Sequence, residues 1–200
     1  MNAVEARKAH PASAAFEIVT AITLTVGRGP AARSIADTAG VTDTDLVADI
    51  GCGPGAAVRE AARRGARAVG IDPSGAALWL AGRISTLRRA DRVSWTPARA
   101  ETLPLADGSV TIVWSLSSAH HWSDLTAALG EIRRVLVPGG KMLIAERLTR
   151  PGARGLAAHG FTRSQADALA EQMTATGFAG VRIETLQAGR RKLVIVSGAG

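Results

Sequence analysis

The 200-residue sequence predicts an α/β fold in which a mostly parallel sheet is packed between helices. Short apolar runs, which are typical of buried parallel strands, alternate along the chain with longer stretches of helical spacing. The first of these runs, residues 47–50, leads directly into the turn Gly51-Cys52-Gly53-Pro54-Gly55 and then into an Ala-rich helical segment. A strand, a glycine turn and a helix together form a ligand cradle, because bare backbone can approach a bound molecule and the helix N–H groups favour an anion.

Two helices are expected in the region before this strand, residues 1–40. Apolar residues at spacings of three and four predict a helix over 11–27. Pro30 and Gly40 are expected to bound a second, shorter helix whose Ile35 faces inward. The polar residues 42–45 then form a turn into the first strand.

After the glycine turn, strands and helices continue to alternate. The expected helices cover 54–64, a segment from 75 to about Ala90, and 124–136, the last closed by Pro138-Gly139-Gly140. The expected strands are 67–71, 92–96, 110–115 and 141–146.

The C-terminal part begins with a loop over 149–160. Thr162 and Gln165 resemble a capping box, which predicts a helix that ends at Gly177. Residues 181–186 and 192–196 flank a short polar segment and favour an antiparallel hairpin. We expect a single domain over 1–200, with a cofactor-binding core at 46–147 and the C-terminal helix and hairpin at 162–197.

Composition limits the possible classes of protein. The apolar content of 46% is that of a folded domain, and the formal charge of +7 comes from scattered arginines, which favours a solvated basic surface over a nucleic-acid stripe. Cys52 is the single cysteine, so an internal disulfide is impossible and a reducing cytosol is compatible. The sequence contains neither an apolar run of about 18 residues nor the layout of a secretory signal, so we expect a cytoplasmic protein without a membrane partner.

The glycine turn fits two ligand-binding patterns. Gly51, Gly53 and Ala56 satisfy the dinucleotide pattern G-x-G-x-x-G/A, whereas residues 49–55 satisfy the acidic-x-G-x-G-x-G pattern of methyltransferases. Both patterns expect an acidic residue about 20 positions later to hold ribose hydroxyls, and Asp72 meets this requirement in either case. The turn alone therefore leaves the ligand open.

Over residues 49–146 the chain resembles the class I S-adenosylmethionine-dependent methyltransferases, particularly the branch of ubiquinone and menaquinone C-methyltransferases. Four blocks carry the resemblance in the right order: VADIGCGPG, GIDPS, AETLPLADGSVTIVWSLSSAHHW and EIRRVLVPGGKMLIAE. The resemblance implies a Rossmann-like, seven-stranded sheet in the order 3-2-1-4-5-7-6 with the last strand antiparallel. It also implies S-adenosyl-L-methionine as the cofactor and strongly lowers the dinucleotide alternative.

By position, the resemblance also implies a set of cofactor contacts. The glycine turn would shape the pocket for the methionine part, Asp72 would accept the ribose hydroxyls, and residues 100–101 would flank the adenine. The residues expected at the cofactor are Asp49, Gly51, Cys52, Gly53, Gly55, Asp72, Pro73, Ala100, Glu101 and Ser115. For Asp72 the competing interpretation is a helix cap.

Two positions depart from the pattern of this branch. Arg99 stands where an Asp usually accepts from the adenine amino group, and Thr111 replaces a frequent Asp in the fourth strand. Because a guanidinium can only donate, Arg99 cannot make the usual contact, and adenine affinity is expected to fall unless backbone groups compensate.

The candidate catalytic residues are His120 and His121, which follow the fourth strand at the rim where open α/β sheets bind ligands. An imidazole can take a proton from a phenol, a hydroxyl or an activated carbon. The competing interpretation is that one His caps or packs beneath the next helix while the other is solvated. Glu146 is expected either to face the pocket or to form a salt bridge at the sheet edge.

The remaining His and Trp residues are assigned structural roles. His159 is expected at the surface, no Cys or His spacing indicates a metal site, and Trp79, Trp95 and Trp114 are expected in the core.

The sequence favours a methyltransferase for a small organic acceptor. After the fifth strand only residues 148–161 are available to cover the acceptor, so the cover must come from this short loop and the N-terminal helices. An open pocket, completed by a second subunit of a homodimer, is therefore expected. The alternative is a protein that binds S-adenosylmethionine or S-adenosylhomocysteine with little or no catalysis. A nucleic-acid methyltransferase lacks support, because the sequence shows no basic stripe with interleaved aromatics.

Overall fold

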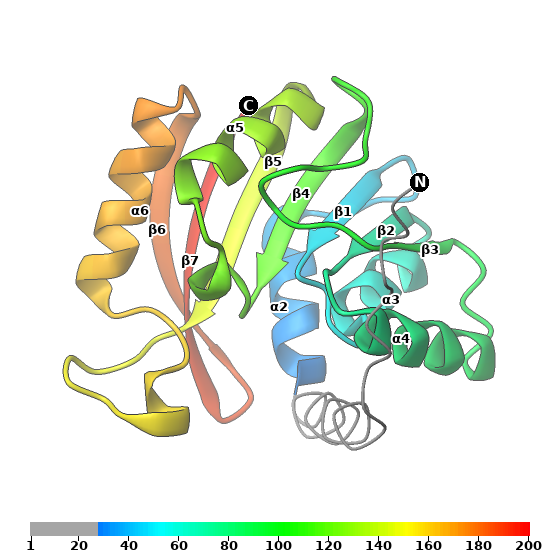
Figure 1. Cartoon of the computed structure of the whole chain (residues 1–200), viewed down its shortest axis with the longest axis horizontal. Helices are drawn as coiled ribbons and strands as arrows, with labels where there is room; N and C mark the ends of the chain where they lie inside the picture. Colours follow the sequence, from blue (N-terminus) through cyan, green and yellow to red (C-terminus); the bar gives the residue numbers. More distant parts are fainter. Residues whose placement is uncertain (1–27) are drawn as a thin grey trace, which may run out of the picture.

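A computed structural model describes residues 28–200, and the helix expected over 11–27 lies outside them. Its seven strands form one sheet in the order β3-β2-β1-β4-β5-β7-β6 (Figure 1). Strands β1 to β5 pair in parallel, and β7 runs antiparallel to both of its neighbours. The strands are β1 (Leu46–Ile50), β2 (Arg67–Ile71), β3 (Val93–Thr96), β4 (Val110–Leu116), β5 (Leu136–Arg147), β6 (Ala179–Ala188) and β7 (Arg191–Ala199). This arrangement confirms the predicted fold class and topology.

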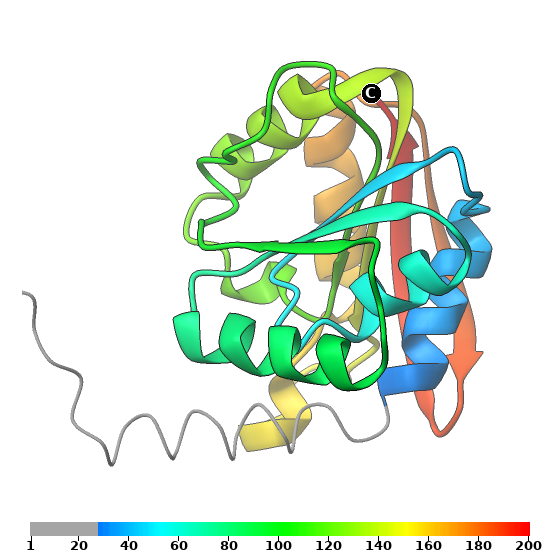
Figure 2. The ribbon, with the colours of Figure 1, turned by 90° about the vertical axis from the view of Figure 1, so that its right-hand side faces the viewer.

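Helices cover both faces of the sheet (Figure 2). Helices α5 and α6 pack on one face with the larger core cluster, and α2 and α3 pack on the other. The helices are α2 (Arg28–Ala39), α3 (Ala56–Arg63), α4 (Gly75–Leu87), α5 (Leu125–Val135) and α6 (Arg163–Ala175), with short 3-10 helices η1 (Ala119–His121) and η2 (Gly155–Ala158). Because both faces are covered, β1 and β4 are almost completely buried along their length.

The helix boundaries follow the expected local signals. Helix α2 ends before Gly40, whose φ of 65° is left-handed, and its Ile35 is fully buried. Helix α6 begins with the predicted capping box, in which the Thr162 hydroxyl accepts from the Gln165 N–H and the Gln165 side chain accepts from the Thr162 N–H.

The start of β5 differs from the sequence prediction. Residues 138–140 were expected to close the preceding helix before a strand from 141, but β5 already begins at Leu136, which pairs with Val110. The register shifts just beyond this pair, so the segment enters the sheet as an irregularity. The Gly139 N–H donates to the Gly200 carbonyl at 2.8 Å, so the other end of the chain supplies the hydrogen bonds that local sequence could not reveal.

The prediction that three tryptophans lie in the core is wrong for one of them. Trp114 is fully buried and Trp95 packs partly buried against the second core cluster, but the Trp79 side chain is 59% exposed. On α4, Ala77, Leu78, Ala81 and Ser85 form the buried face, and Trp79 lies outside it.

In the described part of the chain, no helix is long and apolar enough to cross a bilayer.

Candidate functional site

The glycine turn follows β1 at the edge where the parallel strands end. Its Gly51 and Cys52 N–H groups both donate to the Ile71 carbonyl of β2, at 2.7 and 3.1 Å. Gly51, Gly53 and Gly55 have φ values of 71°, 51° and 75°, a left-handed conformation that strongly favours glycine. The turn is therefore fixed against the neighbouring strand and holds an unusual backbone path.

The three glycines serve different neighbours. A Cβ at Gly51 would lie 1.7 Å from the Ser118 hydroxyl oxygen, and one at Gly55 would lie 2.2 Å from the Trp95 ring. The nearest atom to a Cβ at Gly53 is an Arg28 guanidinium nitrogen at 3.6 Å. Protein packing thus accounts for Gly51 and Gly55, and the open side of the turn is at Gly53.

Asp72 is tied directly to this turn. One carboxylate oxygen accepts from the Gly53 N–H at 2.8 Å, and the other accepts from the Ser74 N–H at 2.9 Å. Ser74, rather than Asp72, caps α4 through its hydroxyl, and Pro73 is held between the two. Because each carboxylate oxygen has a second lone pair, Asp72 retains the capacity to accept two ribose hydroxyls.

A buried acid, Asp49, and a partly buried cation, Arg28, lie close enough beside the glycine turn to interact. Asp49 is 2% exposed, and burial, aided by the charge of Asp72, raises its pKa to about 7 against the opposing effect of Arg28. Burial also lowers the pKa of Arg28, although Asp49 opposes that shift. Among the described residues, Asp49 Oδ1 and Arg28 Nε have no hydrogen-bond partner.

These two unsatisfied groups test whether the cradle fits a cofactor. Buried polar atoms without partners are costly, so their presence in a ligand cradle indicates that a ligand completes them. A carboxylate beside a guanidinium matches a molecule that carries an ammonium and a carboxylate, which is the chemistry of an amino-acid end. Arg28 was not identified from the sequence, because it lies well before the motifs.

Residues 99–101 form the expected adenine side of the cradle. Ala100 is buried, and the Glu101 carboxylate accepts from the Ser123 N–H at 2.7 Å and the Asp124 N–H at 3.2 Å. Arg99 is exposed and pairs with Glu101 at 3.4 Å, and it also contacts the Ser123 hydroxyl. The Arg99 guanidinium is therefore directed toward Glu101 and Ser123.

Two other residues of the predicted site, and the departing position Thr111, are now placed. Ser115 is buried near the end of β4, where its hydroxyl donates to Ser118 at 3.3 Å. Cys52 is buried within the turn, and burial raises the pKa of its thiol well above the ordinary value. Thr111 lies near the opposite end of β4, where its hydroxyl donates to Asp45 at 2.8 Å and accepts from the Leu46 N–H. Thr111 thus helps to hold β4 beside β1, at a distance from the cradle.

The His residues lie at the same edge, in η1 directly after β4. Glu146 is fully buried, and its carboxylate lies 3.0 Å from His120 Nδ1 and 3.3 Å from the His120 backbone nitrogen. Partial burial of the ring, followed by charge repulsion from His120 and His159, lowers the pKa of His121. His159 is exposed, as expected, yet its ring centroid lies 5.6 Å from that of His120. Neither the Glu146 contact nor the approach of His159 has a signal in local sequence.

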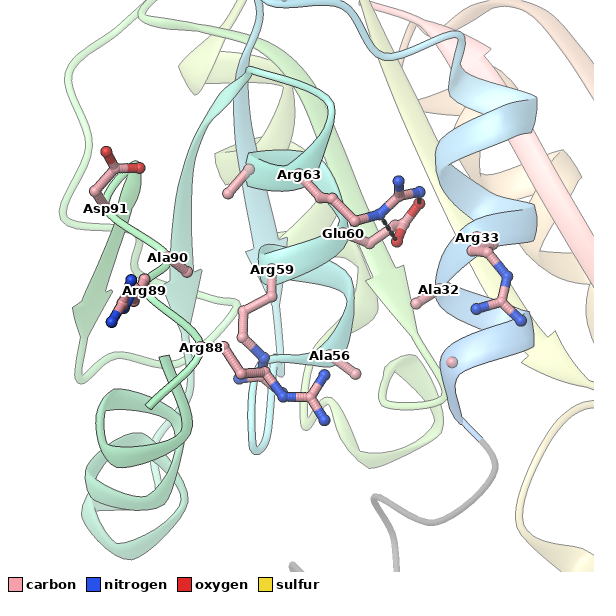
Figure 3. A pocket seen from close by; sticks show the side chains of 12 residues that line it. Ala32, Arg33, Ala56, Arg59, Glu60, Arg63, Arg88, Arg89, Ala90 and Asp91 are labelled. Atoms are coloured by element: carbon pink, nitrogen blue, oxygen red, sulfur yellow. Dashed lines mark hydrogen bonds and ion pairs between the residues drawn. The ribbon is translucent and has the colours of Figure 1, made fainter. Parts of the chain in front are cut away.

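A separate cavity of about 590 Å³ lies between α2, α3 and the segment after α4 (Figure 3). The arginines around it are Arg33, Arg59, Arg63, Arg88 and Arg89. Burial, with help from Arg88, lowers the pKa of Arg59 to about 10, and Arg59 donates to the Pro54 carbonyl at 2.6 Å. Neither Asp49 nor Asp72 lines this cavity, so the cradle, rather than the cavity, is the candidate cofactor site.

Comparison with known proteins gives the class of protein. A family described as "Methyltransferase domain" matches residues 48–144. A methyltransferase structure from Aquifex aeolicus superposes with a TM-score of 0.75 at 15% identity, covering 91% of this chain and 97% of that one. A Haemonchus contortus phosphoethanolamine N-methyltransferase, solved with S-adenosylhomocysteine, gives 0.70 at 18% identity and covers 84% of this chain and 52% of that one. At such identities these structures establish the fold.

Residues 48–144 thus form a methyltransferase domain of the class I S-adenosylmethionine-dependent type, whose cofactor is S-adenosylmethionine. The 27-O-demethylrifamycin SV methyltransferase of Amycolatopsis mediterranei is 36% identical over 57% of this chain and 43% of the relative. The demethylmenaquinone methyltransferase of Tropheryma whipplei is 33% identical over 54% and 44%. The matches thus span less than half the length of these relatives.

Proposed function

We propose that the chain transfers the methyl group of S-adenosylmethionine to a small organic acceptor at the carboxyl edge of the sheet. The observation that carries this proposal is the proximity of two pairs, Asp49 with Arg28 and His120 with Glu146. Ser118, which lies two residues before His120 in sequence, connects them. Its hydroxyl donates to the Ile50 carbonyl at 3.0 Å and lies against Gly51.

The cofactor contacts follow from the groups left free in the cradle. Arg28 would pair with the methionine carboxylate, Asp49 with the ammonium group, and Asp72 with the ribose hydroxyls. When bound, S-adenosylmethionine supplies a methyl carbon on a sulfonium, which a nucleophile displaces in line. Residues 51–55 and Ser115 would orient the methionine part, and Ala100 and Glu101 would border the adenine.

His120 is the proposed proton acceptor. If its Nδ1–H donates to Glu146, the assignment that this hydrogen bond favours, Nε2 carries the lone pair. Glu146 then acts as a positioning residue that fixes the orientation of the ring. An acceptor hydroxyl or activated carbon that must lose a proton would pass it to Nε2, while the new bond to the methyl carbon forms and the carbon–sulfur bond breaks.

Thermal unfolding gives the first test. S-adenosylmethionine and S-adenosylhomocysteine should raise the melting temperature, and NAD should not. An acceptor screen with mass spectrometry then detects methylated product. Replacing both His120 and His121 by Ala should abolish turnover while the cofactor-induced shift remains, whereas unchanged turnover would remove both residues from the mechanism.

The second candidate function is cofactor binding with little or no catalysis. It is favoured by the shortness of segment 148–161 between β5 and α6, and by Arg99 at the adenine side. Cofactor binding without turnover on any acceptor would support it. The proposal also includes a single domain over 1–200, a cytoplasmic location and a homodimer that completes the pocket, and light scattering of the purified chain tests the dimer.

A further inference from the structure

We propose that His120, His121 and His159 bind a divalent transition-metal ion, with Zn²⁺ as the first candidate. The three residues come from two segments far apart in sequence, η1 after β4 and the residue that follows η2. Their ring centroids lie 3.9, 5.6 and 5.8 Å apart, and one potential ligand nitrogen from each ring lies within 4.8 Å of the others. Three imidazoles are a common ligand set for catalytic zinc.

The environment of His120 resembles that of a metal ligand. Its Nδ1 faces the fully buried Glu146 carboxylate, and its Nε2 is buried without a hydrogen-bond partner in the described structure. A histidine that binds a metal through one nitrogen usually donates from the other to a carboxylate or carbonyl, which fixes the tautomer and orients the ring. A metal ion would satisfy Nε2, and the Glu146 charge would offset part of the added positive charge. In the metal-bound chain His120 is therefore a ligand, and the role of proton acceptor proposed above belongs to the metal-free chain.

The present spacing requires only a small adjustment. With Zn–N bonds of about 2.1 Å in a tetrahedron, ligand nitrogens lie about 3.4 Å apart. The rings must therefore close by up to roughly an ångström and a half from the 4.8 Å limit. His121 and His159 are exposed, and their side chains are free of the tight packing that would oppose this movement.

The position of the cluster indicates the class of ligand. Three protein ligands leave one coordination position open, unlike the closed sites that serve structure alone. Because Ser118 connects η1 to the glycine turn, the open position lies beside the proposed acceptor site. This second step rests on the proposed function: we infer that the acceptor offers an oxygen ligand, such as a phenol or hydroxyl.

Zn²⁺ titration of the untagged full-length chain, stripped of metal by a chelator, tests the site. We expect one Zn²⁺ per chain, and Co²⁺ should give the visible absorption of a tetrahedral site. His159→Ala removes an exposed ligand without disturbing the core and should weaken binding by about 100-fold or more, while His159→Asp, which keeps a ligand atom, should retain part of it. Glu146→Gln should weaken Zn²⁺ binding by about 10- to 100-fold.

Two results would overturn the inference: the absence of stoichiometric Zn²⁺ binding, or equal affinity in the natural chain and His159→Ala. A thermal shift with S-adenosylmethionine, measured on the chelator-treated protein, separates this outcome from failure of the proposed function. A cofactor shift without Zn²⁺ binding refutes the metal site alone. Zn²⁺ binding without a cofactor shift refutes the proposed function and leaves the metal site in place.

Discussion

Replacing Asp49 by Asn should make the free energy of unfolding less dependent on pH between the unfolded pKa of 3.8 and the folded pKa of about 7. Asp49 is buried, and its pKa rises from 3.8 to about 7 in the folded state, chiefly through burial. Between these two values the folded chain binds more protons than the unfolded chain, so the free energy of unfolding falls as pH rises. Asn has nearly the same shape but cannot ionise, so Asp49→Asn removes this contribution.

The magnitude follows from the difference of about 3 pKa units, each worth about 1.4 kcal/mol. The cost of ionising Asp49 in the folded cofactor-free chain is therefore on the order of 4 kcal/mol above pH 7, and about 2.5 kcal/mol of it develops between pH 5 and pH 8. Urea unfolding of both proteins at these two pH values measures the effect. Relative to the natural chain, the free energy of unfolding of Asp49→Asn should rise by about 2.5 kcal/mol from pH 5 to pH 8.

The comparison also has a functional readout. Because the proposed partner of Asp49 is the cofactor ammonium group, affinity for S-adenosylmethionine in the natural chain should rise as Asp49 ionises near pH 7. Asp49→Asn should lose that rise. An equal stability difference between the two proteins at pH 5 and pH 8 would refute the assigned pKa and the reasoning built on burial.

Two further substitutions test the cradle. Gly51→Ala combines a left-handed φ with a clash against Ser118, so it should reduce the free energy of unfolding by at least about 2 kcal/mol. Gly75→Ala, whose Cβ meets nothing within 4 Å, is the matched control. Adding Ser118→Gly to the Gly51→Ala chain should restore part of the loss. Arg99→Asn supplies a hydrogen-bond acceptor at the adenine side, so it should tighten S-adenosylmethionine binding about fivefold, the value of one hydrogen bond. Isothermal titration calorimetry measures the affinity, and an unchanged affinity would show that the adenine does not contact this side chain.

The sequence by itself determined the elements of the fold and the position of the cradle. Apolar runs and glycines report on interactions between near neighbours in the chain, so β2, the α6 capping box and the left-handed glycine turn follow directly from local pattern. Asp72 could also be placed, because parallel strands end at one edge and bring their following residues together.

Only the tertiary structure decided which distant groups meet. The approach of Arg28 to Asp49, the pairing of Glu146 with His120 and the approach of His159 all join segments whose separation in sequence carries no periodic signal. The same holds at the start of β5, where hydrogen bonds from the end of the chain draw a glycine-rich turn into the sheet. Local pattern fixes which residues face inward, but packing of whole elements fixes which buried polar groups become partners, and those partners define the chemistry of this site.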